Sequence, residues 1–201
     1  MKTPHLYLAG PEVFRPDAAA AGKRLKQIAQ RAGAEGVFPL DGEPVHDAEA
    51  IKRRCSEMID AADAVVANIT PFRGHHMDPG TAWEIGYAEA RGKPVHLWSN
   101  DPRPLRDRIP AGVELDADGW RDDDGHLVED FELAENLMIA ADAGPVWETA
   151  EKAMRAAVDD IRHRARNTAE RRNARRRFAW VVLAMLGGVA LAATVLASRG
   201  G

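Results

Sequence analysis

The sequence predicts an α/β fold, a doubly wound parallel sheet, with a transmembrane helix added towards the C-terminus. Two observations support this prediction. Short apolar runs alternate four times with stretches of helical periodicity, and an uncharged run of 20 residues follows them, from 178 to 197. Such alternation favours parallel strands in one sheet with helices on both faces. We expect three parts: a front domain over 1–145, a helical, Arg-rich stalk over 146–177 and the transmembrane helix over 178–197.

Four short apolar runs predict the strands of the sheet, at 6–10, 36–41, 64–69 and 94–98. The run at 64–69 is the most continuously apolar of them, as expected for a strand at the buried centre of a parallel sheet.

Apolar residues at helical spacing predict the helices, at 17–32, 48–61, 81–91, 129–141 and 146–164. Residues 100–129 are rich in Asp, Gly and Pro and show no period, so we expect a long loop there with one short strand near Val113.

Charge and cysteine content limit the possible functions. Residues 161–201 hold nine Arg and one Glu, a net charge of +8, whereas the whole chain is −4, so residues 1–160 carry −12. An acidic front domain disfavours nucleic acid as a partner. The single cysteine, Cys55, rules out an internal disulfide and a Cys-rich metal site, and it suits a reducing compartment.

The run at 178–197 has the length of a bilayer crossing, because 20 residues of helix span about 30 Å. Five Arg residues shortly precede it and only Arg199 follows, so the positive-inside rule predicts a single-pass anchor with the front domain in the cytoplasm. A buried core helix is the alternative for the run. For the Arg cluster, a nucleic-acid patch is the alternative to contact with anionic lipid.

The most informative motif is the run from Pro71 to Ala88, which follows the third predicted strand. It places two carboxylates, Asp78 and Glu84, around a Gly-containing turn that opens a helix. Paired carboxylates suit chemistry at a glycosidic carbon. In a doubly wound sheet, ligands bind outside the carboxyl ends of the strands, and this motif falls there.

Further candidates lie just past the ends of the predicted strands: Gly10, Glu12, Asp41 and Asn68. Asn68 would be a lone polar residue at the end of a buried strand, where it needs a hydrogen-bond partner. Glu12 and Asp41 are equally compatible with ordinary turns.

Each carboxylate of the main motif also has a structural interpretation. Thr81 and Glu84 have the spacing of a capping box, and Asp78 before Pro79 could be an N-cap. A carboxylate in the first helical turn would in addition be favoured as the anion, which a nucleophile requires.

We expect neither a metal nor a cofactor. His75 and His76 are adjacent and would point apart, and no third ligand has matching spacing. The glycine-rich and nucleophile-elbow patterns of dinucleotide, ATP and serine-hydrolase sites do not occur.

Several segments, in order over about residues 5–140, resemble the nucleoside 2-deoxyribosyltransferase family. The similar pieces are Tyr7-Leu8-Ala9-Gly10-Pro11, Pro39-Leu40-Asp41, the run 62–68, the run 71–88 with Gly92-Lys93-Pro94-Val95, and the pieces 128–131 and 136–138. The resemblance implies a flavodoxin-like sheet and a two-step, retaining transfer of 2-deoxyribose between nucleobases.

The resemblance also implies roles for individual residues. Glu84 would be the nucleophile that forms a deoxyribosyl ester, Asp78 would contact the substrate, and Tyr7 would lie near the nucleophile. Asn136 would reach the sugar 5′-hydroxyl from a neighbouring subunit, so a homo-oligomer is implied. Substrate contacts are expected from the residues that follow the strands and the motif, namely Gly10, Glu12, Asp41, Asn68, Gly80 and Asn136.

The chain differs from the family pattern at Cys55, where many members carry an Asp or Asn that faces the base. The proton donor therefore stays open between Asp78 and Asp41. A hydrolase of nucleosides or nucleotides on the same scaffold is the first alternative function. A membrane-tethered nucleotide sensor without turnover is the second. The partners expected in either enzymatic case are a (deoxy)nucleoside and a nucleobase.

Overall fold

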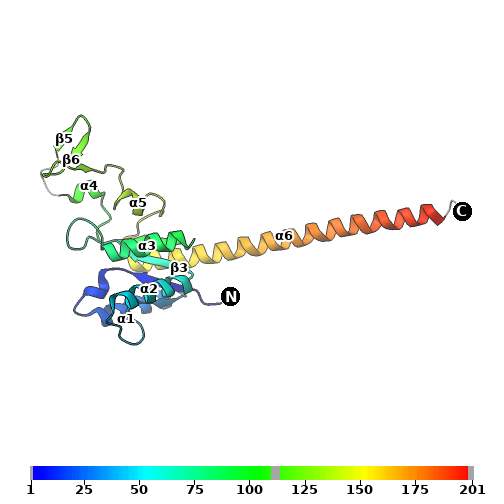
Figure 1. Cartoon of the computed structure of the whole chain (residues 1–201), viewed down its shortest axis with the longest axis horizontal. Coiled ribbons are helices and arrows are strands. Elements are labelled where there is room, and N and C mark those ends of the chain that lie inside the picture. The colour runs from blue at the N-terminus through cyan, green and yellow to red at the C-terminus, as the bar shows by residue number, and fades with distance from the viewer. Residues whose placement is uncertain (1, 110–113, 199–201) are drawn as a thin grey trace. The chain divides into compact units, whose positions relative to one another are not determined.

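The computed structural model describes residues 2–109 and 114–198, with side chains for 2–109 and 115–175. The chain divides into two compact units, one up to Ile161 and one from Arg162 onward. The first unit contains the sheet and all of the predicted site residues (Figure 1).

A four-stranded parallel sheet forms the centre of the first unit. Its strands are β1 (His5–Ala9), β2 (Glu35–Val37), β3 (Ala64–Asn68) and β4 (Val95–Trp98), in the order β2-β1-β3-β4. This is the beginning of the flavodoxin-like order, and the predicted α/β sheet is confirmed. A parallel bridge between Trp98 and Trp147 extends the sheet beyond β4.

Helices cover both faces of the sheet. On one face, Leu6, Leu8 and Val66 pack with α1 (Ala18–Ala32) and with the first turns of α6 (Ala150–Ser198). On the other face, the alternate residues of β1 and β3 pack with α2 (Ala48–Ala61) and α3 (Pro79–Ala90). The period of two along each strand thus gives the sheet two apolar faces, as a doubly wound fold requires.

The order of the strands defines the place where a ligand should bind. The chain leaves β1 towards β2 on one side, through η1 (Pro11–Phe14) and α1, and it leaves β3 towards β4 on the other side, through α3. The neighbouring carboxyl ends of β1 and β3 are therefore the topological switch point, where doubly wound sheets bind their ligands.

The segment between β4 and α6 contains more structure than the sequence predicts. It holds α4 (Leu105–Arg108), α5 (Leu137–Ala140) and an antiparallel sheet of β5 (Glu114–Asp116), β6 (Gly119–Arg121) and β7 (Leu127–Val128). Asp116 forms the first hairpin turn, because its Oδ1 accepts the N–H groups of Asp118 and Gly119. A strand is expected near Val113, which itself lies outside the described residues, and β5 begins at the next residue, Glu114.

The predictions of a transmembrane helix over 178–197 and of a membrane anchor are corrected by the structure. Across the described residues, no helix combines the length and the apolar composition that a bilayer crossing requires. The predicted segment belongs to the distal part of α6, and its side chains lie outside the described residues. In the preceding part of this helix, every residue from His163 to Arg175 is exposed and Arg recurs, which does not suit hydrocarbon.

Candidate active site

Tyr7 and Glu84 meet between the sheet and α3. Tyr7 is fully buried in β1 on the face that α3 covers, and Glu84 lies in the second turn of that helix. The Tyr7 hydroxyl donates a hydrogen bond of 2.5 Å to Glu84 Oε1. Two residues that are 77 positions apart in the sequence are thus brought into direct contact, as the family resemblance implies for them.

Burial controls the electrostatics of this pair. Loss of solvent and, to a lesser extent, the negative charge of Asp78 raise the pKa of Glu84, hydrogen bonds from Tyr7 and Cys55 oppose the increase, and the resulting pKa is about 7. Burial and the neighbouring Glu84 carboxylate raise the pKa of Tyr7 far above its ordinary value. Tyr7 is therefore a neutral hydrogen-bond donor, and Glu84 is a carboxyl group that titrates near neutral pH.

Cys55 is the third member of this cluster. It projects from α2 towards the same apolar face of the sheet as Tyr7 and is half-buried. Burial raises the pKa of the thiol, and the neighbouring Tyr7 and Glu84 also influence that pKa. Cys55, the position at which the chain differs from the expected family pattern, therefore places a neutral thiol beside the carboxylate.

Asp78 is the N-cap of α3. Its Oδ2 accepts hydrogen bonds from Thr81 N at 2.8 Å and from Thr81 Oγ1 at 3.0 Å, and Pro79 occupies the first helical position. Asp78 is therefore an N-cap in the structure, as its structural interpretation predicts. Glu84 is bonded to Tyr7 instead of closing a capping box, and it lies one turn further into the helix than the sequence suggested.

Gly80 is packed against this cap. A Cβ atom at Gly80 would come within 3.0 Å of Asp78 Oδ2, which is closer than almost all real contacts. The glycine of the motif thus leaves room for the capping carboxylate.

A second cluster, formed by Gly10, Glu12 and Asn68, lies at the switch point. Asn68 is the buried last residue of β3, and its Nδ2 donates a 2.6 Å hydrogen bond to Glu12 Oε1. The other oxygen, Glu12 Oε2, is buried and has no hydrogen-bond partner among the described residues, and burial raises the pKa of this carboxyl group. A Cβ atom at Gly10 would lie 2.2 Å from Glu12 Oε2, so the close approach requires glycine.

Two other predicted site residues have local partners. Asp41 accepts hydrogen bonds from Lys26 Nζ at 2.5 Å and from Phe38 N at 2.9 Å, which closes the turn after β2. Asn136 is the N-cap of α5 through Met138 N, and its Nδ2 donates to Glu129 Oε1 at 2.6 Å.

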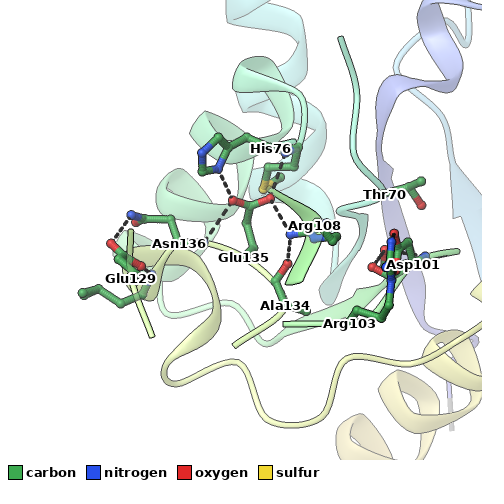
Figure 2. A network of polar contacts seen from close by, with 12 residues as sticks. Thr70, His76, Asp101, Arg103, Arg108, Glu129, Ala134, Glu135 and Asn136 are labelled. Atoms are coloured by element: carbon green, nitrogen blue, oxygen red, sulfur yellow. Dashed lines mark hydrogen bonds and ion pairs between the residues drawn. The ribbon is translucent and has the colours of Figure 1, made fainter. Parts of the chain in front are cut away.

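Asn136 also lines a cavity of about 280 Å³. Its other walls come from α4, from β7 and its preceding turn, and from His76. Two of the polar lining residues, His76 and Asn136, neighbour Glu135. Glu135 is buried, and its carboxylate lies 2.6 Å from His76 Nδ1 (Figure 2). Within the described residues, no group of three His, Cys, Asp or Glu side chains could hold a metal ion.

Sequence reasoning did not find Glu135 or its partner Arg108. Both are buried charged residues, and their side chains approach to 3.7 Å. Local patterns give no signal for them, because a charged residue in a polar loop is ordinarily a solvated one.

Comparison with known protein families gives a match over the part of the chain that contains the candidate site. The profile of the family described as nucleoside 2-deoxyribosyltransferase matches residues 6–138. The chain belongs to this family. An uncharacterized protein of Schizosaccharomyces pombe is 31% identical over 159 residues, which cover 68% of this chain and 75% of the relative.

Solved structures of similar fold include a 2-deoxyribosyltransferase from Leishmania mexicana. It is 32% identical, with a TM-score of 0.67, and the match covers 78% of this chain and 97% of the other. A conserved protein from Enterococcus faecalis is 20% identical, with a TM-score of 0.51 over 81% of this chain and 99% of the other, which shows the shared fold alone. Membership of this family supports nucleosides and nucleobases as small-molecule partners of the chain.

Proposed function

We propose that this nucleoside 2-deoxyribosyltransferase family member transfers 2-deoxyribose between nucleobases through a covalent ester on Glu84. The observation that carries the proposal is the 2.5 Å hydrogen bond from the Tyr7 hydroxyl to a carboxylate whose pKa lies at about 7. A carboxylate that is held in one orientation and titrates near neutral pH suits nucleophilic attack on a sugar carbon.

The reaction consists of two displacements at the anomeric carbon. In the first, an oxygen of ionised Glu84 forms a bond to C1′ while the C1′–N bond breaks, and the electron pair of that bond leaves with the base. The departing base nitrogen takes up a proton. In the second, a nitrogen of the acceptor base attacks C1′, loses its proton, and Glu84 leaves as the carboxylate. The two inversions together retain the configuration of the sugar.

Tyr7 and Asp78 support the nucleophile in different ways. The Tyr7 hydroxyl holds one oxygen of Glu84 and leaves the other for attack. Asp78 begins α3, and its charge raises the pKa of Glu84, which makes the carboxylate more basic and a stronger nucleophile in the first step. Asp78 is the candidate for substrate contact and proton transfer, because both oxygens of Asp41 are bonded to Lys26 and Phe38.

Glu12, Asn68 and Gly10 are proposed to contact the substrate at the switch point, where Glu12 keeps one carboxyl oxygen uncommitted to the described residues. Gly80 would contribute through its place beside Asp78, and Asn136 would contact the sugar from a second copy of the chain in a homo-oligomer.

Mass spectrometry of the intact protein tests the nucleophile. Incubation with a 2′-deoxynucleoside and no acceptor base is expected to add one deoxyribosyl group, and peptide mapping should place it on Glu84. The Glu84→Gln variant is the control and should carry no adduct. An adduct on another residue, or none under conditions where the wild-type protein turns over, would contradict the proposal.

A second measurement separates transfer from hydrolysis. The wild-type protein is incubated with the deoxynucleoside in the presence and absence of a free base. Transfer predicts a new nucleoside that appears only with the acceptor. Free deoxyribose released at the same rate with or without acceptor would instead support the hydrolase. Absence of turnover under both conditions would support a sensor.

A further inference from the structure

Glu135 connects two segments that the proposed function places near the substrate. It lies in the loop before α5, and its side chain is almost completely buried, at 1% exposure. Figure 2 shows its carboxylate between His76 on one side and Arg108 on the other. Both carboxylate oxygens of Glu135 accept backbone hydrogen bonds.

The first set of contacts fixes the loop that leads into α3. Glu135 Oε2 accepts the backbone N–H of Met77 at 2.8 Å, and Glu135 Oε1 meets His76 Nδ1 at 2.6 Å. The next residue after Met77 is Asp78, the N-cap that begins the helix carrying Glu84. The position of the proposed nucleophile therefore depends on a loop end that Glu135 holds.

The loop before Met77 contains left-handed backbone. Arg73 has a φ of 54° and Gly74 a φ of 145°, so the turn uses left-handed backbone that L residues rarely adopt. The loop closes on itself through the hydrogen bond from Phe72 N to His76 O at 2.8 Å. The contacts of Glu135 come directly after that bond and join the loop to the segment before α5.

The second set of contacts fixes Asn136. Its backbone N–H donates to Glu135 Oε1 at 3.0 Å, and its side chain begins α5 and lines the cavity of about 280 Å³. One carboxylate thus orients the segment before Glu84 and the segment that bears Asn136.

Arg108 completes the arrangement. Its side chain is 3% exposed, its Nη2 lies 3.7 Å from Glu135 Oε2, and the same nitrogen donates to the carbonyl oxygen of Ala134. Its Nε and Nη1 are buried without hydrogen-bond partners in the described part of the chain. Buried ion pairs of this kind are often no more stabilising than apolar residues of similar size, so stability alone does not account for the pair.

We propose that Glu135, held by Arg108, is a positioning residue that sets the loop before α3 and the Asn136 segment in the geometry required for deoxyribosyl transfer. This inference rests on the proposed function. It predicts that weakening Glu135 lowers kcat through Glu84 and raises KM through Asn136, in molecules that stay folded.

Two variants test the inference. Glu135→Asp keeps the charge opposite Arg108 and withdraws the carboxylate from Met77. The double variant R108M/E135Q removes both buried charges, so that neither is left unpaired. The control is Glu148→Gln, which removes a surface ion pair with Lys152 at the start of α6.

For both test variants we expect melting temperatures close to that of the wild type, a fall in kcat of at least tenfold and a rise in KM for the deoxynucleoside of severalfold. The control should keep wild-type kinetics. A merely structural role would lower the fraction of active molecules and leave KM unchanged. Wild-type kinetics in a folded R108M/E135Q protein, or in Glu135→Asp, would overturn the inference.

Hydrogen exchange supplies a readout that does not need activity. In both variants, the amides of Met77 and Asn136 are expected to exchange at least tenfold faster, while the amide of Val66 in β3 keeps its protection. Unchanged exchange at both amides would overturn the inference even if the protein had no transferase activity. An inactive wild-type protein whose variants show faster exchange would contradict the proposed function and leave the positioning role supported.

Discussion

A carboxylate that attacks a sugar carbon must be ionised, and burial opposes ionisation. At Glu84 these two requirements are balanced by three neighbours. Burial and the charge of Asp78 raise the pKa of Glu84, whereas hydrogen bonds from Tyr7 and Cys55 lower it, with a result of about 7. The carboxylate is thus available at neutral pH and is a better leaving group from C1′ than an alkoxide would be.

The pH dependence of catalysis should reveal this balance. In the proposed mechanism only ionised Glu84 attacks, so kcat/KM is expected to rise with pH and to level off above an apparent pKa of about 7. Tyr7→Phe removes a hydrogen bond that favours the anion, so its acidic limb should move to higher pH. Asp78→Asn removes a repelling charge, so its limb should move to lower pH. The measurement is kcat/KM between pH 5 and pH 9 for each protein.

The two variants serve as controls for each other because their predicted shifts have opposite signs. Asn is about as good an N-cap as Asp, so Asp78→Asn should leave α3 intact. Shifts in the same direction, or an acidic limb that neither substitution moves, would show that another group controls the rate.

At the scale of the helices, two glycines are expected to respond in opposite ways to the same substitution. Gly22 lies in α1, where an added Cβ would come within 2.4 Å of the buried ring of Phe38. Gly86 lies in α3, where an added Cβ would meet nothing within 4 Å. Gly22→Ala should therefore lower the free energy of unfolding by about 1–3 kcal/mol through overpacking, although alanine favours helix.

Gly86→Ala is the matched control for this packing argument. It should raise the free energy of unfolding by up to about 1 kcal/mol through helix propensity alone. Chemical denaturation of both variants measures the difference. Equal effects of the two substitutions would contradict the packing of α1 on Phe38.

The elements also show which features local sequence can predict. The apolar runs of β1, β3 and β4 and the start of α3 near Asp78 follow from patterns within a few residues. The helix predicted over 129–141 is reduced to α5, because the carboxylates of Glu129 and Glu135 take the N–H groups of Leu137 and Asn136. These side-chain acceptors compete with helical hydrogen bonds, which a periodicity argument does not include.

The contacts of the candidate site also differ in whether local sequence predicts them. Glu84 and Asp78 come from one motif, so their sequence spacing already indicates that they are close. The partners His76 and Glu135 are 59 positions apart, and nothing in either neighbourhood predicts that the loop before α3 meets the segment before α5. The same limit applies to Arg108, whose burial depends on the packing of α4 and not on its own sequence.

For the whole molecule, the environment of Glu84 has a consequence for stability. In the folded chain its pKa is about 7, and in the unfolded chain it returns to about 4.5. Below the lower value the group is protonated in both states and stability is at its full level. As the pH rises through the folded value, the unfolded chain releases its proton more readily, and up to about 3 kcal/mol of stability is lost.

Glu84→Gln removes this titration and keeps an acceptor for the Tyr7 hydroxyl. Near pH 4.5 the melting temperature of the variant should therefore be close to that of the wild type. As the pH rises towards 8, the melting temperature of the variant should exceed that of the wild type by an increasing amount, which reaches several degrees. Because the other carboxylates are common to both proteins, their titration cancels in the difference between the two melting temperatures. A difference that stays constant from pH 4.5 to pH 8 would mean that Glu84 is ionised in the folded chain throughout, and that burial does not place its pKa near neutrality.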